Sequence, residues 1–76
     1  MPHIEIYHFP NSMSDSDRSA LAEEVTEVIA AHFPTKPGKV SIRLNSIDER
    51  DWEEAVVEKM LIPQRSTLIR EPDYLA

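Results

Sequence analysis

Two short segments of the chain alternate between apolar and polar residues, and a longer segment with helical periodicity lies between them. In residues 3–9, HIEIYHF, both isoleucines fall on one face, while His3, Glu5 and Tyr7 fall on the other. Residues 39–45, KVSIRLN, alternate in the same way. Alternation with a period of two, in segments rich in β-branched and aromatic residues, is typical of β-strands. The sequence therefore predicts two strands.

The segment between the two predicted strands carries the signals of one long helix. Ser14 followed three residues later by Asp17 is a weak form of the capping box, with which many helices begin. From there to about Phe33, apolar residues recur on one helix face: Leu21, Val25, Val28, Ile29 and Phe33. A strand, a crossover helix and a second strand predict parallel pairing with a right-handed connection.

The rest of the chain is expected to be helical and to belong to the same single domain, residues 1–76. Residues 49–61 show helical spacing of the apolar residues Trp52, Val56 and Met60. Pro63 then ends or restarts the helix, and QRSTLI adds a short final helical segment. The predicted fold class is therefore α/β. It is a small β-α-β unit of two parallel strands and a long crossover helix, followed by a second helix and a short third one.

The length and composition predict that the protein associates with other copies. A single domain of 76 residues hides only about 60% of the surface that its unfolded chain exposes. The chain has no cysteine, so neither disulfides nor zinc–thiolate sites can add stability. Two strands with helices on one face also leave the other face and both edges open. We expect another subunit to cover them.

The net charge argues against two classes of partner. The 14 acidic and 8 basic residues give a formal net charge of −6. Nucleic acid and anionic membrane surfaces attract cationic proteins, so neither is expected to bind this chain.

No apolar run reaches the roughly 20 residues of a membrane span, and no basic start precedes an apolar stretch as in a signal peptide. The expectation is a cytoplasmic protein.

Few residues are candidates for chemistry. Gly38 is the single glycine, which excludes the glycine-rich loops that bind phosphates. The three histidines lack the spacing of metal ligands, so no metal site is expected. Trp52 is a further candidate, although a tryptophan more often packs in a hydrophobic core than contacts a ligand.

Pro2 differs from these residues because it directly follows Met1. Removal of Met1 would leave a secondary amine at the start of a strand, where the backbone fixes its position. An α-amine has an ordinary pKa of about 8, and burial among apolar groups lowers that pKa toward neutrality, where the amine serves as a base. The alternative is that Pro2 only begins the strand.

Three segments in this order, MPHIEI, SDSDRSALAEEVTEVIAAHF and VSIRL, resemble the tautomerase superfamily of 4-oxalocrotonate tautomerase. HFP after the first strand and IPQ near the end make the chain more similar still to the dimeric, PptA-like branch. The resemblance spans nearly the whole chain. It implies a homodimeric, cofactor-independent keto–enol tautomerase. In such an enzyme Pro2, freed of Met1, moves a proton on a small 2-keto or enol acid such as phenylpyruvate enol.

At the substrate-binding positions, the chain departs from the hexameric member of that family. Met13 and Ser41 stand where the resemblance implies two arginines that bind substrate carboxylates. Arg43, two residues beyond Ser41 and on the same strand face, is the candidate replacement. The alternative reading of Arg43 is an exposed strand residue or an interface ion pair. Trp52 corresponds roughly to an aromatic residue that walls the family's pocket.

The predicted site therefore consists of Pro2 as the catalytic base, with Ser41, Arg43 and Trp52 as substrate-binding residues and no metal. Residues 63–76 extend the chain beyond the compact hexameric enzymes, which favours a homodimer. The alternative function is a non-catalytic oligomeric binding module on the same fold. The missing arginines favour that alternative, and the retained amino-terminal proline disfavours it.

Overall fold

The structure, a computed structural model, describes residues 1–75, which form two compact units. The first unit contains, in chain order, β1 (His3–His8), α1 (Asp15–His32), the 3₁₀ turn η1 (Pro37–Lys39) and β2 (Ser41–Ser46). The second unit begins at Ile47 and contains α2 (Glu49–Trp52), the π-helical turns η2 (Glu53–Leu61) and the 3₁₀ turn η3 (Arg65–Thr67). Within the described residues, none of the helices has the length and hydropathy that crossing a bilayer requires.

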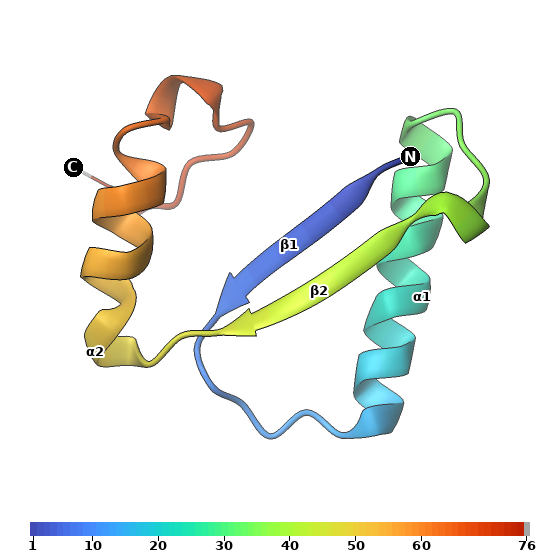
Figure 1. The fold of residues 1–76 in the computed structure, drawn as a ribbon, viewed down its shortest axis with the longest axis horizontal. Coiled ribbons are helices and arrows are strands. Elements are labelled where there is room, and N and C mark those ends of the chain that lie inside the picture. Colours follow the sequence, from blue (N-terminus) through green and yellow to red (C-terminus); the bar gives the residue numbers. More distant parts are fainter. Residues whose placement is uncertain (76) are drawn as a thin grey trace. The chain divides into compact units, whose positions relative to one another are not determined.

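β1 and β2 pair in parallel, with α1 as the crossover between them (Figure 1). In the register, Ile4 lies opposite Ile42 and Glu5 lies opposite Arg43, so the aliphatic residues of the two strands share one face and the Glu5–Arg43 pair lies on the other. The α/β class and the β-α-β order that the alternation predicted are confirmed.

Hydrogen bonds fix both ends of α1. Ser14 Oγ accepts a hydrogen bond from the Asp17 N–H at 3.1 Å, and the Asp17 carboxylate accepts one from the Ser14 N–H at 3.2 Å. This pair is the predicted capping box. At the other end, the Phe33 N–H donates to the Ile29 carbonyl at 2.8 Å. Pro34 follows directly, and the residue before a proline is disfavoured in the helical conformation, so α1 ends there.

The apolar face predicted for α1 is only partly covered. Leu21, Val25 and Ile29 are half-buried as expected, but Val28 and Phe33 are 57% and 55% exposed. A sheet of two strands is too narrow to cover the whole apolar face of an 18-residue helix. Val28 and Phe33 belong to the predicted apolar face but are exposed in the single chain.

The second unit follows the predicted order of helices with two local differences. α2 and η2 together cover residues 49–61 as predicted, but η2 is π-helical, and the Ile62 N–H donates to the Val57 carbonyl at 2.9 Å. After Pro63, η3 is a single 3₁₀ turn and is shorter than the predicted segment QRSTLI. In the part of the chain that the structure describes, Val56 and Val57 are the only buried hydrophobic residues.

The first unit does not enclose a core of its own. None of its residues is buried, and even Ile4, Ile6 and Ile42 are only half-buried. Aliphatic side chains of this kind are normally fully buried in stable domains. The unit therefore presents apolar surface that another packing partner can cover.

Candidate active site

Pro2 lies at the entrance to β1, next to a cleft at the end of the crossover. Its carbonyl accepts a hydrogen bond from the Ser41 N–H at 3.2 Å, which ties the beginning of the chain to the start of β2. Figure 1 shows the amino terminus beside the last turn of α1. The cleft has a volume of about 410 Å³ and is lined by Met1, Pro2, Phe33, Pro34 and Thr35. The backbone thus holds Pro2 at the side of an open cleft.

The nitrogen of Pro2 is an amide as long as Met1 is attached, and an amide nitrogen is not a base. Met1 is 95% exposed, so the described part of the chain leaves this residue open to an aminopeptidase. Removal of Met1 would convert the Pro2 nitrogen into a secondary amine at the same place beside the cleft.

Sequence reasoning did not connect Pro2 with Phe33, Pro34 and Thr35. The signal was present in the predicted topology. In a parallel pair, the crossover must return to the end of the sheet at which the first strand began. Residues that directly precede the second strand therefore lie close to the start of the chain.

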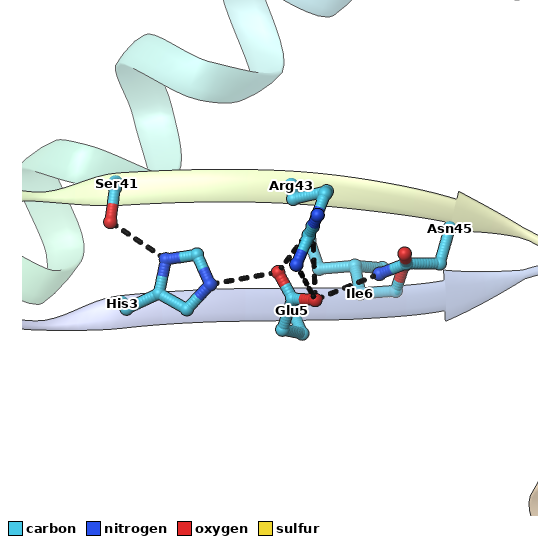
Figure 2. Close-up of polar contacts among 6 residues, drawn as sticks. All are labelled: His3, Glu5, Ile6, Ser41, Arg43 and Asn45. Carbon is cyan, nitrogen blue, oxygen red and sulfur yellow. Dashed lines mark hydrogen bonds and ion pairs between the residues drawn. The ribbon is translucent and has the colours of Figure 1, made fainter.

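Arg43 projects from the middle of β2 and forms an ion pair with Glu5 of β1 (Figure 2). Its Nε donates to both carboxylate oxygens of Glu5 at 3.1 Å, and its Nη2 lies 3.1 Å from Oε1. The hydrogen bond from Arg43 lowers the pKa of the Glu5 carboxyl, and the hydrogen bond to Glu5 raises the pKa of the Arg43 guanidinium. The Arg43 side chain is 68% exposed, so its remaining N–H groups are accessible.

His3 and Asn45 also contact the Glu5 carboxylate (Figure 2). His3 Nε2 lies 2.8 Å from Glu5 Oε2 and His3 Nδ1 lies 2.7 Å from Ser41 Oγ, while Asn45 Nδ2 lies 3.5 Å from Glu5 Oε1. An ionised carboxylate only accepts, so Nε2 carries a hydrogen, and in a neutral imidazole Nδ1 accepts from the Ser41 hydroxyl. Ser41 and Arg43, both predicted substrate-binding residues, are therefore joined in one polar row on the face of the sheet.

Within one chain, the Glu5–Arg43 end of this polar row is separate from the Pro2 cleft, whereas Ser41 at its other end donates its N–H to the Pro2 carbonyl. Glu5 and its partner Arg43 lie three residues beyond Pro2, or about 10 Å along a strand. Successive side chains of a strand point to opposite faces, and Arg43 does not line the cleft. If Arg43 binds a substrate held at Pro2, it must therefore come from a neighbouring copy of the chain.

Trp52 lies in the second unit, where α2 meets η2. Its indole N–H donates to the Tyr74 hydroxyl at 3.2 Å, which ties this helix to the residues that follow η3. Arg65 and Glu71 form an ion pair in the same unit. The role of Trp52 as a wall of the substrate pocket stays a prediction.

Histidine and carboxylate side chains do not gather into a metal site in residues 1–75. His3 is engaged by Ser41 and Glu5, and His8 Nδ1 lies 2.7 Å from the Phe9 carbonyl. The expectation of catalysis without a metal rests on the chemistry of a proline amine, which needs none.

Comparison with known proteins identifies the class of enzyme. A family model described as "Tautomerase enzyme" matches residues 2–59, more than half of the chain. Tautomerase PptA of Cronobacter sakazakii is 39% identical over 74 residues, which cover 97% of both chains. The Tautomerase PptA proteins of an Enterobacter species and of Escherichia coli are each 38% identical over the same share.

These matches show that the chain belongs to the tautomerase family, and it is therefore an isomerase. Its similarity to the PptA tautomerases confirms the predicted PptA-like branch. The family and the names of these relatives favour an enzyme over the alternative of a non-catalytic binding module.

Proposed function

We propose that this isomerase is a cofactor-independent keto–enol tautomerase whose general base is the amine of Pro2, exposed by the removal of Met1. Its substrates are small 2-keto and enol acids such as phenylpyruvate enol. The observation that carries the proposal is the position of Pro2, which the hydrogen bond between its carbonyl and the Ser41 N–H holds at an open cleft. A base fixed by the backbone meets each substrate in the same geometry, which is the main requirement for general base catalysis.

In the proposed reaction, one proton moves from oxygen to carbon. The lone pair of the Pro2 amine takes the hydroxyl proton of the enol, and the electrons of the broken O–H bond form the new carbonyl. The electrons of the carbon–carbon double bond then take a proton from the Pro2 ammonium at the adjacent carbon. The amine is regenerated, so no cofactor or other reactant is consumed.

Two features near the Pro2 amine are expected to affect its protonation in opposite directions. Phe33 and Pro34 give the cleft apolar walls, and apolar surroundings favour the uncharged amine. The last carbonyl groups of α1 carry partial negative charge, which favours the protonated amine. A bound substrate displaces the remaining water, and we propose that desolvation then outweighs the effect of the helix.

Arg43 is proposed to bind the substrate carboxylate from a neighbouring copy. Glu5 occupies the edge of the guanidinium that carries Nε and Nη2. The opposite edge, with Nη1, stays available to a carboxylate, because Arg43 presents five N–H donors in a planar fork. Because Glu5 already occupies one edge of the Arg43 guanidinium, only the other edge can bind a carboxylate. This arrangement suits a substrate with one carboxylate better than a dianion.

The assembly is proposed to be a homodimer, because the first unit has no buried side chain and its apolar strand residues are only half-buried. Sedimentation equilibrium is expected to give a mass of two chains of 8.7 kDa each. A mass of one chain or of six chains would contradict the proposal.

The proposed function is tested by the same folded protein with and without Met1. The amine exists only in the protein without Met1, so only that protein should accelerate the ketonisation of phenylpyruvate enol.

A further inference from the structure

One side of the cleft beside Pro2 is lined by Phe33, Pro34 and Thr35, which were not among the predicted site residues. We infer that Phe33 and Thr35 form the substrate-recognising wall of this cleft and select enols with one carboxylate and an aromatic ring. Phe33 packs against the ring, and the Thr35 hydroxyl donates a hydrogen bond to the carboxylate or to the carbonyl oxygen. The inference rests on the proposed role of Pro2, because a substrate must lie in this cleft to meet the amine.

Phe33 is exposed and held in one backbone conformation. Its N–H donates to the Ile29 carbonyl at 2.8 Å, and its φ and ψ of −102° and 122° are those of an extended residue before a proline. At 55% exposure it is one of the large hydrophobic residues that the chain leaves in solvent. An aromatic side chain beside a catalytic cleft, on a fixed backbone, offers apolar contact area at little cost in conformational entropy.

Among the described residues, Thr35 is the only polar side chain that lines the cleft, because the other lining residues are Met1, Pro2, Phe33 and Pro34. Thr35 is half-buried, and within residues 1–75 no hydrogen bond engages its hydroxyl. A half-buried threonine whose hydroxyl has no partner, in a cleft with otherwise apolar lining, is suited to orient a ligand that is mostly apolar.

The charges near the cleft favour a monoanion. None of the described residues that line the cleft has a cationic side chain, and the carboxyl end of α1, with its partial negative charge, lies at its edge. A second carboxylate on the substrate would therefore lose its hydration without gaining a counter-charge in this chain. An aromatic ring in the same place would instead gain the contact with Phe33.

The test is the ratio of kcat/KM for phenylpyruvate enol to kcat/KM for pyruvate enol, which differ only by the ring. Phe33→Ala is expected to lower this ratio about fivefold, mainly through KM for the aromatic substrate. Val28→Ala is the matched control, because Val28 is a similarly exposed apolar residue near the end of α1 that does not line the cleft. The control should leave the ratio unchanged.

Thr35 gives an independent arm of the test. Thr35→Val keeps the shape of the side chain but removes the donor, and kcat/KM for both enol acids should fall about tenfold. Thr35→Ser restores the hydroxyl and should restore most of the activity. This arm also decides the matter if Phe33→Ala does not fold.

The inference is overturned if Phe33→Ala leaves the substrate ratio unchanged, or if Thr35→Val is as active as the wild type. In either case the requirement for a free Pro2 amine can still hold, and the proposed function then stands. If protein that carries Met1 is as active as the processed protein, the proposed function fails regardless of these variants.

Discussion

Protein that retains Met1 is expected to fold and assemble normally but to ketonise phenylpyruvate enol no faster than buffer does. With Met1 in place the Pro2 nitrogen is an amide, and a lost general base typically costs about 10²- to 10⁴-fold in rate. Met1 is exposed and Pro2 is held through its carbonyl, so retention leaves the strand pairing and the Phe33, Pro34 and Thr35 walls of the cleft unchanged and adds only Met1 to the lining. The rate is measured on protein whose intact mass shows whether Met1 is present.

Pro2→Ala is the matched control for this experiment, because it leaves a primary amine after removal of Met1. It should slow the reaction without abolishing it. Circular dichroism and sedimentation must agree between all three proteins. Equal turnover by folded protein with and without Met1 would show that the amine of Pro2 is not the base.

Arg43→Ala is expected to reduce kcat/KM for phenylpyruvate enol by about tenfold or more, since a hydrogen bond between charged groups is worth about 1.5–3 kcal/mol. The substitution also leaves Glu5 without its cation, and an unpaired carboxylate could itself repel an anionic substrate. The double variant Glu5→Gln with Arg43→Ala separates the two effects. It should stay as impaired as the single variant if Arg43 contacts the substrate.

Arg50→Ala controls for the loss of one positive charge from an acidic protein, because Arg50 is exposed and its Nη2 lies 3.5 Å from Asp48. This variant should keep wild-type kinetics. Recovery of activity in the double variant, or an unchanged kcat/KM in Arg43→Ala, would show that Arg43 does not bind the substrate and only forms its ion pair with Glu5.

The strands and α1 could be predicted because their signals are local. The period of two in residues 3–9 and the Ser14–Asp17 capping box depend only on neighbouring residues, and both are confirmed. The exposure of Val28 depends on what packs against α1, which its local pattern does not specify, and the helical spacing of residues 49–61 did not distinguish the π-helical η2 from an α-helix.

The candidate site was predictable in part for the same reason. Pro2 was visible from its place in the chain, but its neighbours Phe33 and Thr35 come from the return of the crossover. The ion pair of Glu5 with Arg43 depends on the strand register. Alternation alone cannot distinguish registers that differ by two residues, because such a shift keeps every side chain on the same face.

The titration of Pro2 tests the central claim most directly. The pH dependence of kcat/KM reports the essential base of the free enzyme, and nitrogen NMR of the processed protein reports the protonation of Pro2 itself. The pKa of Glu5 is lowered by Arg43, so this carboxyl is already ionised well below neutrality and does not produce a rising limb there. We predict that kcat/KM rises with pH and that its midpoint coincides with the titration midpoint of the Pro2 nitrogen. A rate that stays constant while Pro2 loses its proton, or that rises at a clearly different pH, would contradict the account.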